Sequence, residues 1–278
     1  GVMLSHRNLV VNVDQGLAVI KILPDETLVA FLPFFHIYGM NVMLNTHLIA
    51  GARLICMPRF DLPAFLGFVQ DHRVRMVMAV PPVANALAKH PLVDSYDISS
   101  LKVFVSAAAP LGAELSNACG ARTGAMTMQG YGMTELSPIS HFSNEERAVA
   151  GAVGFTVPNT LCKIVDAGGQ ALGVDAEGEL CIKGPQVMMG YWKNEAATKE
   201  VLMNDGWLLT GDVAQMDKDG YCRIIARKAD IDAQNLRFAA HHAPGIQVHA
   251  PHSAWYFQRP NDRAYGHCQA IRGWRCCR

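Results

Sequence analysis

Short apolar runs alternate with helical patterns through the first half of the chain. The runs have the length of buried strands and are expected at 52–57, 74–80, 101–107 and 126–129. The helical patterns between them are expected at 62–72, 83–89 and 111–121. Strands that are apolar on both faces and alternate with helices are typical of βαβ units around a parallel sheet. The first half is therefore predicted to be an α/β layered parallel sheet with flanking helices.

The second half has a different pattern. Short strands separated by glycine-rich turns are expected at 162–166, 178–184 and 222–226. The Asp-Gly pair within 217–221 predicts a hairpin in front of the last of these strands. Asn194 is the predicted N-cap of a helix over 195–202, because its side chain can accept a hydrogen bond from the first helical turn. This half is predicted to form a small antiparallel β-barrel.

These patterns divide the chain into three parts. Residues 1–158 are predicted to be an α/β sheet subdomain that is truncated at its N-terminus, and residues 159–228 to be the β-barrel subdomain. Residues 229–278 hold no Lys, no Glu and one Leu, but five His, six Arg, two Trp and three Cys. Because no periodicity persists there, 229–278 is expected to be an atypical, poorly structured tail. A frameshifted reading, an alternative terminal exon or a divergent domain would each explain it.

Charge and cysteine content narrow the class of protein. The formal net charge is zero and no basic stripe is present, which argues against a nucleic-acid partner. Five cysteines stand singly in apolar runs, as reduced cysteines of cytoplasmic proteins do, at 56, 119, 162, 181 and 222. No secretory signal precedes the first polar segment. A cytoplasmic location is therefore expected.

One stretch is long enough to cross a membrane. Residues 27–52 contain no Asp, Glu, Lys or Arg. Pro33, His36, Asn41 and His47 interrupt the stretch, and polar groups are costly in hydrocarbon. A buried strand followed by a helix is favoured over a transmembrane helix, so no transmembrane segment is predicted.

Two of the predicted strands end in segments that could hold a ligand. "SAAAP" (106–110) follows one strand and "QGYGMTE" (129–135) follows the next. Ligands of parallel sheets bind beyond the carboxyl ends of the strands, so the two segments mark the expected site. The second segment combines glycines, which let a backbone approach closely, with an aromatic ring, a hydroxyl and a carboxylate.

Six motifs stand in order along residues 1–230. They are "GVMLSHRNLV", "FLPFFHIYGM", "LKVFVSAAAPLG", "MQGYGMTELSP", "GELCIKGPQVMMGYW" and "DGWLLTGDVAQMDKDGYCRIIARK". Together they resemble the adenylate-forming (AMP-binding) enzyme superfamily, and within it the 4-coumarate and fatty acyl-CoA ligases. Each motif is weak by itself, but six of them in this order do not arise by chance.

The resemblance implies a fold and an activity. The fold would be that of a partial N-terminal domain of an acid–CoA ligase. In the implied reaction, a carboxylate attacks the α-phosphate of ATP to give acyl-AMP and pyrophosphate, and the thiol of CoA then displaces AMP. ATP/AMP, Mg²⁺ and CoA are the implied cofactors, and a small-molecule carboxylic acid is the implied partner. Aryl-propenoic, medium-chain and long-chain acids all remain open as substrates, as does the oligomeric state.

The resemblance also implies nucleotide contacts. Tyr131 would stack on adenine, and Asp212 would accept hydrogen bonds from both ribose hydroxyls with Arg227 beside it. Thr134 would donate to the α-phosphate. The full set of implied nucleotide contacts is Ala107, Ala108, Ala109, Pro110, Gln129, Gly130, Tyr131, Gly132, Thr134, Asp212 and Arg227.

Each of these residues also has a plainer interpretation. Tyr131 alone would be a packed aromatic at the end of a strand. Thr134 and Glu135 alone would be an ordinary helix start. Asp212 would be an exposed turn residue and Arg227 a surface arginine. The motifs around them favour the functional interpretation.

The remaining implied roles concern catalysis and the acyl group. Thr134, Glu135 and His36 are the implied catalytic residues, with Glu135 as the ligand of Mg²⁺. His36 would gate the mouth of the acyl pocket and Tyr38 would line it, together with Ala107 and Gly132. Taken alone, His36 would be a core histidine with satisfied hydrogen bonds. Ala107 stands where the family has glycine, and its methyl group would narrow the acyl pocket.

Parts of the family pattern fall outside this sequence. The phosphate-binding loop of the family would end at Gly1, and the adenylation lysine would lie beyond residue 228, where no lysine occurs. The resemblance therefore implies an acid–CoA ligase that is present as an inactive fragment. Two alternatives stay open: a non-catalytic remnant that binds nucleotide or acyl groups, and an adenylating enzyme completed by a partner chain.

Overall fold

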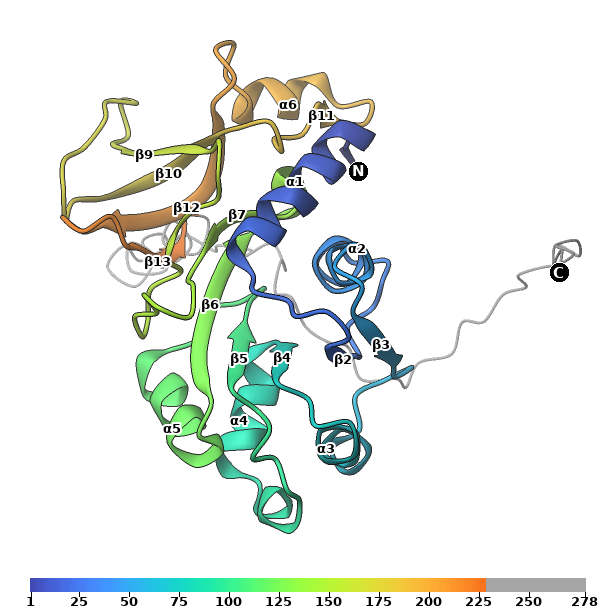
Figure 1. Cartoon of the computed structure of the whole chain (residues 1–278). Coiled ribbons are helices and arrows are strands. Elements are labelled where there is room, and N and C mark those ends of the chain that lie inside the picture. Colours follow the sequence, from blue (N-terminus) through green and yellow to red (C-terminus); the bar gives the residue numbers. More distant parts are fainter. Residues whose placement is uncertain (229–278) are drawn as a thin grey trace, which may run out of the picture. The chain divides into compact units, whose positions relative to one another are not determined.

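A computed structural model describes residues 1–228, and strands alternate with helices through the first part of that range (Figure 1). The helices there are α1 (His6–Val19), α2 (Thr46–Ile49), α3 (Leu62–Asp71), α4 (Pro81–Lys89) and α5 (Ala113–Thr123). The strands are β1 (Val2–Met3), β2 (Thr27–Ala30), β3 (Arg53–Cys56), β4 (Met76–Ala79), β5 (Val103–Ser106), β6 (Met126–Gly132), β7 (Ile139–Phe142) and β8 (Phe155–Thr156). The prediction for the tail at 229–278 concerns residues outside this described part.

The predicted alternation is confirmed, with shifted boundaries. Strands β3 to β6 and helices α3 to α5 each overlap the segment predicted for them. All residues of β4 and β5 are buried, as expected for strands that are apolar on both faces. Helix α4 begins at Pro81, ahead of its predicted start, because the first turn of a helix tolerates proline, whose missing N–H is not needed there.

The predicted layered parallel sheet is found in part, and the α/β class is right. β4, β5 and β6 are parallel neighbours, and β7 and β8 extend the same sheet antiparallel. Residues 133–138 alone join β6 to β7, whereas a parallel return needs a crossover of about a dozen residues or more. The chain must therefore turn straight back. β2 and β3 form a separate two-stranded parallel sheet.

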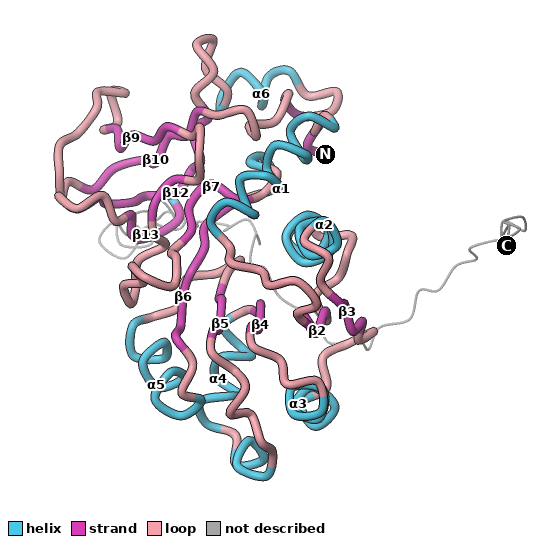
Figure 2. Tube along the Cα trace, viewed as in Figure 1, coloured by secondary structure: helices cyan, strands magenta, loops and turns pink. Residues whose placement is uncertain are grey.

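Helices lie on both faces of the five-stranded sheet (Figure 2). Phe104 of β5 packs in a cluster with side chains from α3 and α4. Its neighbours Val103 and Val105 pack in a second cluster with the π-helix η1 (Tyr38–Asn45). Successive side chains of a strand point to opposite faces, so β5 contributes to both cores.

The second part of the described range is mainly antiparallel. Its elements are β9 (Leu161–Val165), β10 (Glu177–Lys183), β11 (Gly190–Tyr191), α6 (Glu195–Val201), β12 (Leu208–Met216) and β13 (Cys222–Arg227). The predicted hairpin is confirmed by the bond from the N–H of Gly220 to the carbonyl of Asp217, 3.0 Å long. The predicted cap is confirmed as well, because Asn194 Oδ1 accepts from the N–H of Ala197 at 3.1 Å.

The predicted β-barrel is not present in residues 1–228. Four strands form an open sheet in the order β13-β12-β10-β9, with β9 and β13 at opposite edges. Barrels with a side-chain-filled interior use about eight strands, and four are too few to close in that way. The sheet instead buries one face on a core that includes Ile164, Leu180 and Leu208.

The charge-free stretch 27–52 folds as a buried strand followed by helices, as favoured. It contains β2, η1 and α2, although the first helix is π-helical. Asn41 in its middle donates through Nδ2 to the carbonyl of Ser137 at 2.7 Å and to that of Leu9 at 3.2 Å. In the described part of the chain, no helix combines the length and apolar character needed to cross a membrane.

The predicted subdomain boundary between residues 158 and 159 stays a prediction. Several interactions cross it: β1 pairs with β11. Gln15 donates to Thr160 Oγ1 at 3.2 Å, and Asn8 donates to the carbonyl of Pro185 at 2.8 Å. Helix α1 therefore ties the N-terminal residues to the segment in front of β11.

Candidate functional site

The two segments singled out in the sequence lie side by side in the structure. β5 and β6 are parallel, and Ser106 is in register with Gln129. The segment 107–110 follows β5, and the side chain of Gln129 accepts a hydrogen bond from the N–H of Leu111 at 2.9 Å. This bond fixes the end of the 107–110 loop against β6, beside the predicted nucleotide contacts Gly130 and Tyr131.

The loop 107–110 is largely exposed to solvent. Ala108, Ala109 and Pro110 are exposed, while Ala107 is half-buried and donates its N–H to the carbonyl of Ala79 at 3.2 Å. Ala108 has φ +69°, a left-handed conformation that costs a non-glycine residue about 1 kcal/mol or more. Strained backbone of this kind concentrates at ligand-binding positions. The loop can therefore offer main-chain groups to a flat ligand.

Tyr131, Asp212 and Arg227 are brought together from three strands. The hydroxyl of Tyr131 donates to Asp212 Oδ2 at 2.6 Å, and Arg227 Nε donates to Asp212 Oδ1 at 3.0 Å. Burial, and after it the Asp212 carboxylate, raise the pKa of Tyr131 well above its usual 10. The phenol therefore stays protonated and remains a donor to Asp212.

A bulge in β12 places Asp212. Gly211 has φ +72°, which glycine adopts without strain, and the pairing of β12 with β10 shifts register at this point. Its N–H donates to Glu179 Oε1 at 3.1 Å, and the N–H of Asp212 donates to Thr210 Oγ1 at 3.2 Å. Each residue of the Thr-Gly-Asp sequence thus has a part in holding the carboxylate.

A second bulge, in β13, places Arg227. Val213 pairs with Ala226 but Ala214 pairs with Ile224, so Ile225 is an extra residue. Without it, Ala226 rather than Arg227 would stand opposite Asp212. Because side chains alternate along a strand, a shift of one residue would turn Arg227 to the other face. The bulge is therefore what makes the Asp212–Arg227 pair.

Thr134 and Glu135 lie on the 3-10 turn η3 (Thr134–Leu136), directly after β6. Thr134 is exposed and Glu135 is half-buried. Tyr191 donates through its hydroxyl to Glu135 Oε1 at 2.8 Å, and the N–H of Met188 donates to the carbonyl of Glu135 at 2.8 Å. Burial, followed by the bond to Glu135, raises the pKa of Tyr191 to about 12. The motifs did not single out Tyr191, although it stands in "GELCIKGPQVMMGYW".

His36 and Tyr38 lie at the start of η1. His36 is exposed, and its Nδ1 accepts from the N–H of Tyr38 at 3.2 Å. Tyr38 is buried in the cluster that also contains Val105 and Ile139, and Ala107 packs against that cluster. Tyr38 thus belongs to the cluster against which Ala107 packs, while the described hydrogen bond of His36 is local.

Several buried polar atoms near the site have no partner among the described residues. They are Ser106 Oγ, Gln129 Nε2, His141 Nε2 and Ser143 Oγ, on or directly beyond β5, β6 and β7. His141 is in register with Tyr131, with the two rings 6.0 Å apart. A buried polar group without a partner is costly, so this part of the sheet suits a polar ligand or ordered water.

His141 should make stability depend on pH. Burial lowers its pKa from 6.5 to about 4, so the unfolded chain binds a proton between these values that the folded chain does not. The free energy of unfolding should therefore fall as pH drops below 6.5, by up to about 1.4 kcal/mol for each pH unit. Urea unfolding at pH 7, 6 and 5 measures this.

His141→Gln is the matched variant for that measurement, because it has no titrating ring. Its stability should change less over the same pH range than that of the unaltered chain. Part of the pH dependence of stability should remain in His141→Gln, since burial also lowers the pKa of His47. Equal slopes in the two proteins would contradict the assignment to His141.

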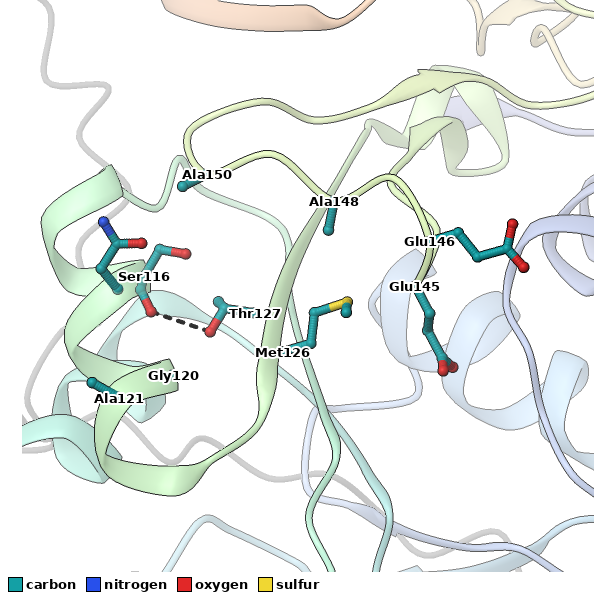
Figure 3. A pocket seen from close by; sticks show the side chains of 10 residues that line it. Ser116, Gly120, Ala121, Met126, Thr127, Glu145, Glu146, Ala148 and Ala150 are labelled. Carbon is teal, nitrogen blue, oxygen red and sulfur yellow. Dashed lines mark hydrogen bonds between the residues drawn. The ribbon is translucent and has the colours of Figure 1, made fainter.

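A separate hollow of about 380 Å³ lies between α5 and the segment 145–150 (Figure 3). Ser116, Met126 and Thr127 contribute to its wall, and Thr127 Oγ1 donates to the carbonyl of Ser116 at 3.2 Å. Met126 begins β6, whereas Tyr131 stands near its other end. The hollow is therefore distinct from the candidate nucleotide site.

Comparisons with known proteins agree with this geometry. Residues 1–192 match the model of a family described as "AMP-binding enzyme". The chain is 41% identical over 236 residues to a probable 4-coumarate–CoA ligase 1 of Dictyostelium discoideum, covering 83% of this chain and 43% of that protein. It is 40% identical over 242 residues to 4-coumarate–CoA ligase 1 of Solanum tuberosum, covering 83% and 44%. The chain thus spans less than half the length of these relatives.

A solved structure extends the likeness to three dimensions. ATP-bound MatB from Rhodopseudomonas palustris superimposes with a TM-score of 0.78 at 32% identity, over 83% of this chain and 46% of that one. The α/β fold of the described residues is thus that of the corresponding part of MatB. With a family model that matches most of its length, the chain belongs to the AMP-binding enzymes.

Proposed function

We propose that this chain is part of an acid–CoA ligase, and that its described residues bind the adenosine monophosphate portion of ATP and of an acyl-adenylate. The observation that carries the proposal is the Tyr131–Asp212–Arg227 arrangement beside the largely exposed loop 107–110. An aromatic ring, a nearly buried carboxylate and a cation within hydrogen-bond reach of each other suit a base, a ribose diol and a phosphate. The named ligase relatives and ATP-bound MatB support the same interpretation.

Each part of the nucleotide has a proposed contact. Adenine stacks between the ring of Tyr131 and the backbone of 107–110, the loop whose end Gln129 holds through its bond from the N–H of Leu111. The ribose hydroxyls donate to Asp212. Thr134 and Arg227 donate to the α-phosphate, where charge-assisted hydrogen bonds are strong. The Tyr38 cluster with Ala107 receives the acyl group, with His36 at its mouth.

Glu135 is the proposed ligand of Mg²⁺. In residues 1–228 no group of three or more His, Cys, Asp or Glu side chains could hold a metal ion. Mg²⁺ is commonly held by one or two carboxylates together with substrate phosphates and waters, so one carboxylate beside a polyphosphate fits it. Bound there, Mg²⁺ would neutralise phosphate charge. Tyr191 occupies one oxygen of Glu135 and leaves the other available.

Calorimetric titration with AMP tests the nucleotide site. Asp212→Ala should weaken AMP binding by about 1–3 kcal/mol, because both ribose hydroxyls lose a charged acceptor. Glu135→Ala is the matched acidic control and should change AMP binding little, since AMP has no polyphosphate for a metal to bridge. Equal losses in the two variants, or no AMP binding by the unaltered chain, would contradict the proposed site.

Pyrophosphate release with a panel of carboxylic acids tests catalysis separately. Release that depends on the acid would support adenylation by this chain, alone or with a partner chain. AMP binding without release would reduce the proposal to a nucleotide-binding remnant. The panel should include aryl-propenoic, medium-chain and long-chain acids, because the described residues do not distinguish among them.

A further inference from the structure

The Asp212 carboxylate accepts a hydrogen bond on each of its two oxygens from side chains of the chain itself. Tyr131 donates to Oδ2 at 2.6 Å and Arg227 donates to Oδ1 at 3.0 Å. The Asp212 side chain is 7% exposed, whereas that of Arg227 is 50% exposed. The Tyr131 bond has the short length of a hydroxyl donating to a carboxylate, which is among the stronger neutral-to-charged hydrogen bonds.

The number of remaining acceptor positions matches a ribose. A carboxylate offers about four lone-pair positions. Tyr131 takes one on Oδ2 and Arg227 takes one on Oδ1, which leaves one on each oxygen. A vicinal diol has two hydroxyl donors, and a carboxylate fixed in one orientation can accept both. A carboxylate free to rotate would have to lose that freedom on binding.

We propose that the Tyr131 hydroxyl is a positioning group for Asp212, so that Tyr131 sets the preference for a ribose with both hydroxyls in addition to stacking on the base. This inference rests on the proposed function. The backbone of Tyr131 belongs to β6, whereas Asp212 stands on β12 in the other sheet. The hydroxyl of Tyr131 can therefore orient the Asp212 carboxylate from a separate strand. The hydroxyl is thus a tie between the base-binding strand and the sugar-binding strand.

Tyr131 is better suited than Arg227 to orient the carboxylate. The phenol has one donor on a ring with few rotamers, and it stays protonated because its pKa is raised. The Arg227 side chain is half-exposed and long, with many rotatable bonds. Loss of the phenol should therefore disturb Asp212 even when Arg227 remains.

The test compares two nucleotides in four proteins. AMP and 2′,3′-dideoxy-AMP are titrated by calorimetry into the unaltered chain, Tyr131→Phe, Asp212→Ala and the double variant. Phenylalanine keeps the stacking ring and removes the hydroxyl alone. Tyr131→Phe should lower AMP affinity by about fivefold to tenfold while the dideoxy nucleotide binds as before. In the Asp212→Ala background the same change should have no further effect on AMP.

A purely structural or stacking role predicts a different result. In that case Tyr131→Phe would weaken both nucleotides equally and would add to Asp212→Ala. Tyr96→Phe, which removes the hydroxyl from a ring packed against the α3 and α4 cluster, serves as the matched control and should leave the sugar preference unchanged. Thermal unfolding of each protein checks that it is folded.

Two outcomes separate this inference from the proposed function. If Asp212→Ala loses the preference for AMP but Tyr131→Phe keeps it, the positioning role is overturned and the nucleotide site stands. If the unaltered chain binds neither nucleotide, both are overturned.

Discussion

Replacing Gly132 with alanine should destabilise the folded chain by about 3 kcal/mol or more and remove AMP binding. A Cβ at this position would collide with the carbonyl oxygen of Pro138 and lie 2.8 Å from its carbonyl carbon. These atoms are backbone of the facing strand segment, so they cannot swing away as a side chain would. Gly132 is in register with Ile139 at the turn that presents Thr134, so the site should be lost together with the fold of the turn.

Gly173→Ala is the matched control for this change. A Cβ there would meet no atom within 4 Å, so the variant should stay within about 0.5 kcal/mol of the unaltered chain. Urea unfolding of the three proteins gives the two differences, and AMP titration is run on the same samples. Equal stability of the two variants would show that the β6–β7 turn can open without cost.

The parallel strands were predictable because a strand that is buried on both faces appears in the sequence as a continuous apolar run. β4 and β5 are short apolar runs, and every residue in them is buried. The strand β7 shows no such run, since "ISHF" mixes polar and apolar residues. Its pairing is decided by the shortness of the 133–138 connection, which reverses the chain. The β-barrel prediction failed because the sequence pattern of the strands indicates an antiparallel sheet but does not indicate whether the two edge strands pair to close it.

The candidate site, like the fold, has a part that could be predicted from the sequence and a part that could not. Tyr131, Thr134 and Glu135 lie in one contiguous motif, and local spacing was enough to group them. The bond between Tyr131 and Asp212 joins residues 81 apart, and only the resemblance to a family linked them beforehand. The position of Arg227 depends on the extra residue Ile225, and no pattern in "CRIIAR" marks a bulge there. Tyr191 escaped notice because its part is to hold Glu135 rather than to contact a ligand in the proposed scheme.

Phe104→Ala should lower the free energy of unfolding by about 3–5 kcal/mol, the usual loss for a fully buried phenylalanine. Phe104 has no exposed surface and stands in the middle of β5, the strand that leads into the 107–110 loop. Val174→Ala, on an exposed valine, is the matched truncation and should have little effect. Urea unfolding measures both losses, and similar values for the two variants would contradict the packing of β5 described above.

The same variant connects the core to the proposed site. A ligand that binds only the folded chain stabilises it by about 2.7 kcal/mol at a concentration 100 times its Kd. AMP at that excess should therefore recover a large part of the loss in Phe104→Ala. At the same AMP concentration the double variant Phe104→Ala/Asp212→Ala should recover less, because its affinity for AMP is lower. Equal recovery in the single and double variants would mean that AMP stabilises the chain without using Asp212.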